Sequence, residues 1–425
     1  MTNPRSQVKR NIGFVSTRFL GTDGVSLESE KWVAVLQRLG HICYYFSGES
    51  DRPAEYSQIV PEAHFKHPEI ERIHLLAFSE TKRRPELSRA VQQMKDYLKQ
   101  HLYAFVHDFG IELLVVENAL AIPLNLPLGL ALTEFIAETG FPILAHHHDF
   151  FWERKRFLVN CVWDYLNMAF PPHLPSIQHV VINSSAADQL SLRMRIAGVI
   201  VPNVMDFDNP PAPPDDYAAD VRAAIGLDPD ERLFLQPTRV VPRKRIERAI
   251  ELASRLGRRV HLVVTHVAGD EGDPYEEYLR NYAKLLDVPV SFASDIIHQH
   301  RGWLPDGRKV YSLWDVYPHA DIVTYPSDIE GFGNAFLEAV YFRRPVVVNN
   351  YSIFYTDIKP KGFRVIEFDE YIDIETVRRT REVLDHPELA REMAENNYQL
   401  AKRHYSYATL ERHLQTLLSE CFGED

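Results

Sequence analysis

The chain is poor in cysteine, with three cysteines among 425 residues, at Cys43, Cys161 and Cys421. No two of them form a CxxC pair and their number is odd, which argues against a disulfide framework and against a cysteine-based zinc site. Scarce and widely separated cysteines are typical of a reducing compartment, so we predict a cytoplasmic protein.

The sequence also lacks an excess of basic residues, since its formal net charge is -12. Proteins that bind nucleic acids need such an excess to displace counterions from phosphates, so we expect no nucleic-acid partner. At the N-terminus, the cations of MTNPRSQVKR are not followed by an apolar stretch long enough for a signal peptide.

A long uninterrupted hydrophobic run is absent as well. The most apolar stretch, residues 119–136, is broken by two prolines, Asn125 and Glu134, and falls short of the roughly 20 apolar residues that a membrane span needs. We predict that this stretch is buried core and that the chain has no transmembrane segment, while peripheral membrane contact stays open.

Short apolar runs rich in Val, Ile and aromatic residues alternate with helical patterns along most of the chain. Such runs are typical of parallel strands that are covered by helices on both faces. Twelve of these runs begin at Asn11, His41, Ile111, Phe141, His179, Gly198, Arg232, Arg259, Pro289, Ala320, Arg344 and Phe363. Because the chain is also too long for one core, the pattern predicts an α/β protein with two Rossmann-like doubly wound domains.

The break between the two series of runs lies at residues 205–230, which are rich in prolines and acidic residues and lack a strand pattern. We interpret this segment as an interdomain connector. The predicted domains are therefore residues 1–204 and 205–400, and residues 401–425 form a helix that returns to the first domain.

The strongest local signal is the segment YPSDIEGFGNAFLEA, residues 325–339. It predicts a strand, a loop with Glu330, and a helix that begins near Asn334. The amides of Phe332, Gly333 and Asn334 at the helix start suit oxygen-rich or anionic groups. Glu338 lies about a turn and a half into the helix. The spacing by itself equally permits a structural corner with a capping glutamate.

This segment, with Glu330-x7-Glu338, resembles the signature of retaining glycosyltransferases of the GT-B fold, especially glycosyltransferase family four. The resemblance implies two Rossmann-like domains that face a central cleft. It further implies that Glu330 and the amides of Phe332, Gly333 and Asn334 hold the hydroxyls of the donor sugar, and that Glu338 binds the ribose.

A second matching segment is PTRVVPRK, residues 237–244, at the end of a predicted strand. Taken alone, its cations could be ordinary surface residues. In the family, an Arg and a Lys at this spacing, here Arg239 and Lys244, neutralise the donor diphosphate. The resemblance therefore implies no covalently bound cofactor and no requirement for Mg²⁺ at the protein site. Arg245 departs from the family pattern, which usually has Gly after the Lys.

The third match is AHHHDFFWER, residues 145–154. On a strand, His146 and His148 share one face and His147 points the other way. Because no third ligand with suitable spacing accompanies them, we predict no metal site, and we interpret His146 and His147 as structural histidines whose polar groups are satisfied. In the family, a His at the position of His148 contacts the donor sugar near the anomeric centre.

The residues after His148 could serve the acceptor. Asp149 completes the family's His-Asp pair, and Arg154 lies in the run Glu153-Arg154-Lys155-Arg156, which suits an anionic acceptor or, alternatively, is a solvated helix start. Gly21 and Gly24, in TRFLGTDG, match the family's loop that closes over the diphosphate and the acceptor. This match is weak by itself because no GxGxxG is present.

The resemblances together predict a retaining transferase that moves a hexose from a nucleotide diphosphate sugar, of the GDP-mannose or UDP-glucose type, to a hydroxyl of a small polar acceptor. HHHDFFWER and ENALAIPLN are similar to family members that build compatible solutes, for example mannosylglucosylglycerate synthases, so a glycerate- or glucosylglycerate-type acceptor is expected. A GT-B phosphorylase, a nucleotide-sugar epimerase, a non-catalytic regulator, and transfer to a lipid or polysaccharide remain alternatives.

Overall fold

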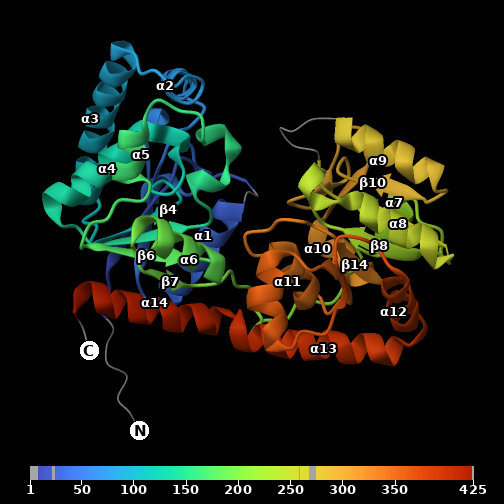
Figure 1. The fold of residues 1–425 in the computed structure, drawn as a ribbon. Helices are drawn as coiled ribbons and strands as arrows, with labels where there is room; N and C mark the ends of the chain where they lie inside the picture. The colour runs from blue at the N-terminus through green and yellow to red at the C-terminus, as the bar shows by residue number, and fades with distance from the viewer. Residues whose placement is uncertain (1–7, 22–23, 258, 268–273, 424–425) are drawn as a thin grey trace, which may run out of the picture. The chain divides into compact units, whose positions relative to one another are not determined.

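The computed structural model describes residues 8–21, 24–257, 259–267 and 274–423. Contacts within the chain divide it into two compact units (Figure 1). The first unit comprises Met1–Val204 and Tyr407–Asp425, and the second comprises Met205–Ser406.

The first unit is built on a seven-stranded sheet. Its strands are β1 (Asn11–Val15), β2 (Ile42–Ser47), β3 (Ser57–Ile59), β4 (Leu113–Glu117), β5 (Ile143–His147), β6 (Ile177–Val181) and β7 (Gly198–Ile200). The order is β3-β2-β1-β4-β5-β6-β7 and every pairing is parallel.

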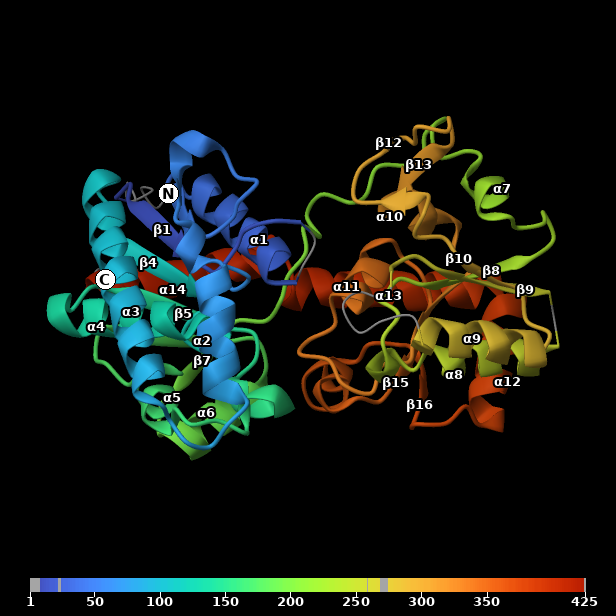
Figure 2. The ribbon, with the colours of Figure 1, turned by 90° about the horizontal axis from the view of Figure 1, so that it is seen from above.

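Helices cover both faces of this sheet because its strands are apolar on both faces. All five residues of β4 are buried, and its four apolar residues, 113–116, contribute alternately to two hydrophobic cores. One core is formed with α3 (Pro85–Asp108) and α4 (Leu126–Thr139), and the other with α1 (Gly24–Arg38) and α14 (Tyr407–Phe422). Figure 2 shows α3 and α4 together on the first unit.

The apolar stretch at residues 119–136 is buried core, as predicted. Its residues within α4 are buried almost throughout, and α4 ends at Gly140, which has a left-handed φ of 63°. Among the described helices, none combines the length and the apolar character that crossing a membrane requires.

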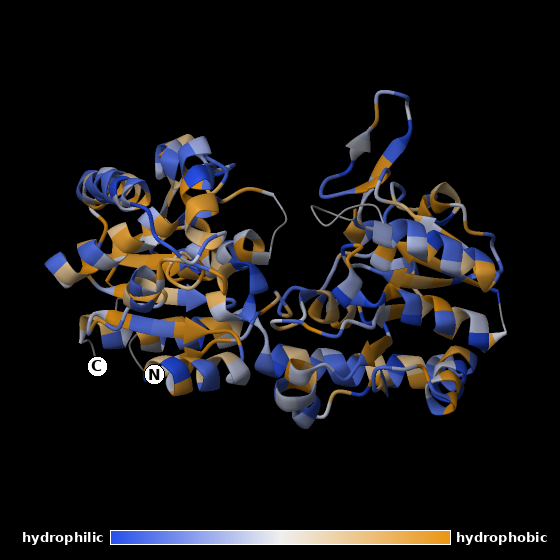
Figure 3. Ribbon diagram, turned by 45° about the horizontal axis from the view of Figure 1, so that its top comes forward, coloured by the Kyte–Doolittle hydropathy of each residue, from blue (hydrophilic) through white to orange (hydrophobic). Residues whose placement is uncertain are grey.

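The second unit has a six-stranded parallel sheet with the order β10-β9-β8-β14-β15-β16. Its strands are β8 (Arg232–Gln236), β9 (Val260–Val264), β10 (Val290–Phe292), β14 (Ile322–Tyr325), β15 (Val346–Asn349) and β16 (Ile366–Phe368). Its helices include α8 (Ile246–Leu256), α9 (Pro274–Leu285), α11 (Asn334–Tyr341), α12 (Ile374–Asp385) and α13 (Pro387–His404). Hydropathy colouring shows the strands of both units as predominantly apolar (Figure 3). The predicted α/β class with two parallel sheets is confirmed.

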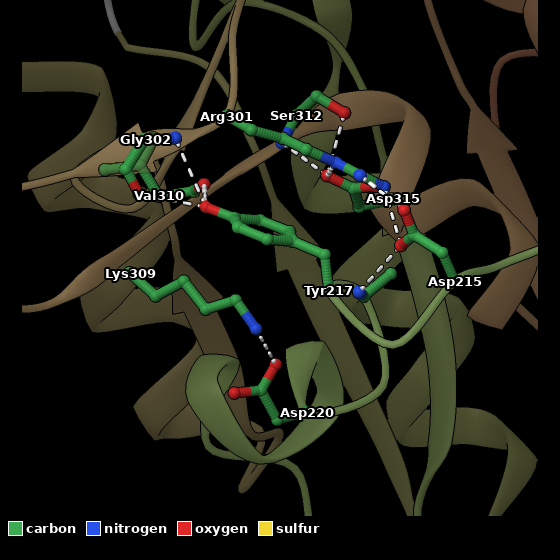
Figure 4. Close-up of polar contacts among 10 residues, drawn as sticks. Asp215, Tyr217, Asp220, Arg301, Gly302, Lys309, Val310, Ser312 and Asp315 are labelled. Atoms are coloured by element: carbon green, nitrogen blue, oxygen red, sulfur yellow. Dashed lines mark hydrogen bonds and ion pairs between the residues drawn. The ribbon is translucent and has the colours of Figure 1, made fainter.

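The interpretation of residues 205–230 as a connector needs correction, because this segment packs within the second unit. It contains the short helix α7 (Val221–Ile225), and Ala218 and Val221 are buried. The Tyr217 hydroxyl donates to the carbonyls of Gly302 and Val310 at 2.9 and 2.7 Å (Figure 4). These contacts join the segment to a small sheet of β11 (Ile297–His298), β13 (Lys309–Ser312) and β12 (Gly302–Trp303), which the sequence did not predict.

Charged side chains reinforce the same junction. The Arg301 guanidinium donates to the carboxylates of Asp215 and Asp315, and Lys309 forms an ion pair with Asp220 at 2.7 Å (Figure 4). Acidic residues of this segment, which contributed to its interpretation as an interdomain connector, therefore form specific ion pairs within the second unit.

The expected boundary at residue 401 also shifts. It lies inside α13, which packs on α11 in the second unit and continues to His404. The chain passes to the first unit between Ser406 and Tyr407, and α14 is the helix that packs there against α1.

Candidate active site

In each large sheet, the strand order reverses at one point, between β1 and β4 in the first unit and between β8 and β14 in the second. Ligands of open parallel sheets bind outside the carboxyl ends of the strands at such a reversal, because the neighbouring connections leave there on opposite sides. Residues at the carboxyl ends of these strands are therefore the candidates for a site.

In the second unit, the structure brings Lys244 and Glu330 together at this position. Lys244 lies in the loop after β8, Glu330 lies in the loop after β14, and the ammonium and the carboxylate form a short ion pair. Arg243 adds a contact of 3.5 Å to Glu330 and donates to the carbonyl of Ile329 at 3.0 Å. The two loops are thus tied together by side-chain and backbone bonds.

Burial shapes the electrostatics of this pair, since the side chains of Lys244 and Glu330 are only 9% and 10% exposed. Burial raises the pKa of Glu330, but the adjacent Lys244 ammonium outweighs this and holds the pKa below its ordinary value. Burial lowers the pKa of Lys244 against the opposing effect of Glu330. Lys244 and Glu330 therefore form an ion pair that is largely excluded from water. An anionic ligand that binds Lys244 can change the contacts of both side chains.

Two further side chains follow strands of this sheet, the cation Arg239 after β8 and the imidazole His266 after β9. Arg239 is exposed, and its charge contributes to lowering the pKa of Lys244, after burial and the charge of Arg243. His266 follows β9, and burial, then Lys244, then Arg239 lower its pKa to about 4. His266 was not among the predicted site residues, although its place at the end of the predicted strand run that begins at Arg259 was a usable signal.

The loop before α11 has a backbone that only glycine suits at Gly333. Its φ is 125°, and an added Cβ would lie 2.5 Å from the hydroxyl of Tyr351. That hydroxyl donates to the carbonyl of Phe332 at 2.7 Å, and the Phe332 ring packs edge-on against Tyr405. The start of α11 at Asn334 is as predicted.

Glu338, within α11, has a hydrogen-bond partner of its own. Its carboxylate accepts a hydrogen bond of 2.7 Å from the Tyr317 hydroxyl, and burial followed by the Glu338 charge raises the pKa of Tyr317 well above its ordinary value. Glu330 and Glu338 are therefore held by different side chains.

Arg245, which stands where the family usually has Gly, occupies a left-handed backbone conformation with φ 47° and ψ 43°. Glycine adopts this conformation without steric cost, which explains the family preference. In this chain the Arg245 side chain forms an ion pair with Asp328, so it also fastens the loop after β14.

In the first unit, the carboxyl ends of β4 and β5 gather Glu117, His146 and His148. Glu117 and His146 are register partners on neighbouring strands. Glu117 Oε2 lies 3.0 Å from His146 Nδ1 and 3.1 Å from His148 Nε2. His147 points to the opposite face, as predicted, and contacts His179.

This cluster overturns two expectations. A third potential metal ligand does accompany the two histidines, because Glu117 comes from the neighbouring strand. The expectation that the polar groups of His146 and His147 are satisfied is also wrong, since buried His146 Nε2 and His147 Nδ1 have no hydrogen-bond partner. Burial opposes ionisation of Glu117, but the two imidazoles lower its pKa to about 2.

Asn118 organises the predicted His148-Asp149 pair. Its side chain accepts from the His148 amide at 3.0 Å and donates to Asp149 at 3.0 Å, and its own φ is 60°. Asp149 in turn forms an ion pair with Arg154. The charge run of residues 153–156 lies in two short 3₁₀ turns, Phe151–Glu153 and Lys155–Phe157.

The two glycines of the first loop have different environments. Gly21 has φ 72° and its amide donates to Asp51 at 3.2 Å, so a left-handed turn requires it. Gly24 is the first residue of α1, is exposed, and has open space around it. Thr22 and Asp23 between them lie outside the described residues.

His147 and His179 form a second buried imidazole pair, with His147 Nε2 and His179 Nδ1 at 2.9 Å. Both rings are almost fully buried. Burial and then the nearby His173 lower the pKa of His179 to about 4, and burial lowers that of His147 well below its ordinary value. One ring must donate and the other accept, so the pair is neutral.

We expect this pair to weaken the fold in acid. Between pH 6.5 and 4 the unfolded chain binds protons that the folded pair excludes, so stability falls as the pH falls through this window. His179 alone should account for about 3 kcal/mol at pH 4. Urea unfolding midpoints at pH 7 and pH 4 should drop less for His179→Gln than for the wild type. The exposed His107→Gln is the control, and equal drops in all three proteins would contradict the expectation.

Comparison with known proteins places these features in context. The family of glycosyl transferases group 1 matches residues 219–400. A mannosylglucosylglycerate synthase of Thermotoga maritima is 34% identical over 428 residues, covering 92% of this chain and 95% of that protein. A mannosylglucosylglycerate synthase of Petrotoga mobilis is 29% identical over 401 residues, covering 86% and 88%.

Solved structures share the fold. A glycosyltransferase from Rickettsia africae ESF-5 has a TM-score of 0.70 at 13% identity, covering 98% of this chain and all of that one. Sucrose-phosphate synthase from Thermosynechococcus elongatus has a TM-score of 0.66 at 13% identity, covering 98% and 100%.

Proposed function

The chain belongs to the group 1 glycosyl transferases, which have the GT-B fold, and from this membership we propose that it transfers a hexose from a nucleoside diphosphate sugar to a glycerate-type acceptor with retention of configuration. The observation that carries the proposal is the buried Lys244–Glu330 pair at the strand-order reversal of the second unit.

In the proposed reaction, catalysis depends mainly on stabilising the negative charge of the departing diphosphate. The bond between the anomeric carbon and the diphosphate oxygen breaks, the acceptor oxygen bonds to the same face of that carbon, and its proton passes to the departing diphosphate. Negative charge therefore develops on the diphosphate, where Arg239 and Lys244 are proposed to stabilise it. These cations and the amides at the start of α11 take the part that a protein-bound Mg²⁺ plays elsewhere.

The donor sugar and ribose are proposed to bind at the loop before α11. Arrival of the diphosphate gives Lys244 a second anionic partner and leaves Glu330 available to accept hydrogen bonds from sugar hydroxyls. The backbone of Phe332, Gly333 and Asn334 is proposed to contact the sugar, and Glu338 to bind the ribose. The observed Tyr317–Glu338 hydrogen bond supports this by fixing the Glu338 carboxylate.

The remaining predicted residues belong to the first unit. His148 is proposed to contact the donor sugar near the anomeric centre, and Gly24 to contact the diphosphate. Gly21, Asp149 and Arg154 are proposed to serve the acceptor. The ion pair between Asp149 and Arg154 and the Asn118 hydrogen bonds support a preorganised polar surface at the end of β5.

The two relatives of Thermotoga maritima and Petrotoga mobilis are named as synthases of mannosylglucosylglycerate. For this chain we propose a mannosyl donor and a glucosylglycerate acceptor, so purified protein should release GDP from GDP-mannose when glucosylglycerate is present and form a product that carries one added mannose. NMR of the new glycosidic linkage tests retention of configuration.

Parallel reactions with UDP-glucose, with free glycerate, and with lipid or polysaccharide acceptors define the specificity. Release only with lipid or polysaccharide would overturn the acceptor class. Conversion of the nucleotide sugar without an acceptor would contradict sugar transfer and indicate an epimerase. Turnover driven by inorganic phosphate would instead indicate a phosphorylase.

A further inference from the structure

Glu117, His146 and His148 place three metal-ligating atoms within 4.8 Å of one another, with Glu117 and His146 buried and His148 nearly so. The ligands come from the carboxyl ends of two adjacent strands, β4 and β5, next to the strand-order reversal of the first unit. From this geometry we propose that the first unit binds one divalent transition-metal cation, of the Zn²⁺ class, through Glu117, His146 Nδ1 and His148 Nε2.

Unsatisfied buried atoms in the cluster support a bound cation. His146 Nδ1 is 3.0 Å from Glu117 Oε2, and Glu117 Oε1 and His146 Nε2 are buried without a hydrogen-bond partner. These are nitrogen and oxygen atoms that a transition-metal cation can take as ligands. Leaving such atoms buried and unpaired destabilises a fold, and a bound cation removes that cost.

The surroundings hold the ligands rigidly. The Trp32 ring stacks on His146 with 4.3 Å between the ring centroids. The backbone at His148 is fixed by the Asn118 side chain, which accepts from its amide. Orientation by packing and by hydrogen bonds around the ligands is what metal sites need in order to bind tightly.

The charge balance favours a cation as well. The Glu117 side chain is fully buried. A buried carboxylate requires compensation by positive charge or by a metal. A divalent ion supplies that charge with neutral imidazoles as its ligands.

The chemistry of the ligands selects the class of metal. Two imidazole nitrogens and one carboxylate oxygen suit Zn²⁺ and its first-row neighbours, whereas Mg²⁺ and Ca²⁺ prefer oxygen ligands alone. A His₂Glu set also leaves a coordination position open for water or a substrate oxygen. The site adjoins Asp149, so that position is close to the residues proposed for the acceptor. A bound cation would take His148 Nε2 and so replace the direct contact of that nitrogen with the donor sugar.

The test measures metal binding in the absence of any sugar. Full-length protein is stripped with a chelator, dialysed against Zn²⁺, and analysed for metal per chain. We expect one Zn²⁺ per wild-type chain. Glu117→Gln and His148→Gln should bind at least about 100-fold more weakly, because even loss of a supporting contact costs 10–100-fold in affinity. His179→Gln, which alters the other buried histidine pair, should bind like the wild type.

A second measurement uses wild-type protein only, so it stands even if the variants fail to fold. Co²⁺ bound to this mixed nitrogen and oxygen set should give the intense visible absorption of a four-coordinate site. Absence of stoichiometric Zn²⁺, a weak spectrum typical of six oxygen ligands, or undiminished binding by folded Glu117→Gln and His148→Gln would each overturn the proposal. Because no sugar is present, these outcomes are independent of whether transfer occurs.

Discussion

Replacing Lys244 by alanine is expected to slow sugar transfer about 100- to 1000-fold, equivalent to about 2.7–4 kcal/mol of transition-state stabilisation. The reason is the position of its ammonium at the carboxyl ends of β8 and β14, where it is nearly excluded from water. Charge developing on a leaving diphosphate is stabilised most strongly by a fixed cation in such a site. Initial rates of GDP release with saturating acceptor measure the effect.

Arg245→Gly is the matched control for this variant. It removes a cation from the adjacent position, and glycine accepts the left-handed backbone there without strain. We expect Arg245→Gly to keep transfer within about threefold of the wild type, since exposed ion pairs such as Arg245–Asp328 contribute little. Near-normal rates for folded Lys244→Ala would remove the basis of the proposed leaving-group role.

The second large effect is expected from Glu330→Ala, which should lower the free energy of unfolding by about 3–5 kcal/mol. The substitution leaves the Lys244 ammonium buried without its main partner, and breaking a buried ion pair on one side exposes the full cost of the remaining charge. Urea unfolding of the wild type and the variant measures the loss. The variant should also lose affinity for the donor sugar.

A double variant separates the loss of folding stability from the loss of sugar transfer. Lys244→Met combined with Glu330→Leu removes both charges and fills similar volume, so much of the stability should return. Transfer should remain lost, because neither the cation nor the carboxylate is present. If the double variant is as unstable as Glu330→Ala alone, the stability effect does not arise from the unpaired Lys244 charge.

The secondary structure was predicted well where the local pattern is strong. All twelve predicted strand runs overlap a strand of one of the two large sheets, and the predicted start of α11 agrees with the structure. The missed strands, β3, β11, β12 and β13, are two to four residues long and lie in polar or irregular segments. Their formation depends on partners such as Tyr217, which come from distant parts of the chain.

The candidate site was predictable where a motif supplies its own chemistry. Arg239, Lys244 and Glu330 were identified because their two segments resemble those of family-four glycosyltransferases, and the structure places Lys244 in contact with Glu330, 86 positions away. Glu117 was not identified, because it ends an apolar run and has no neighbour in sequence that suggests a ligand. Its role depends on the register between β4 and β5, which sets it beside His146.

The sequence by itself therefore determined the α/β class, the positions of the long strands, and the residue types available at the strand ends. These properties follow from hydrophobic periodicity and glycine placement, which act over a few neighbouring residues. Only the tertiary structure decided that Lys244 pairs with Glu330, that His266 joins them, and that Glu117 faces two histidines. Strand order and register bring these side chains together, and they result from packing of the whole sheet, which short-range sequence patterns do not encode.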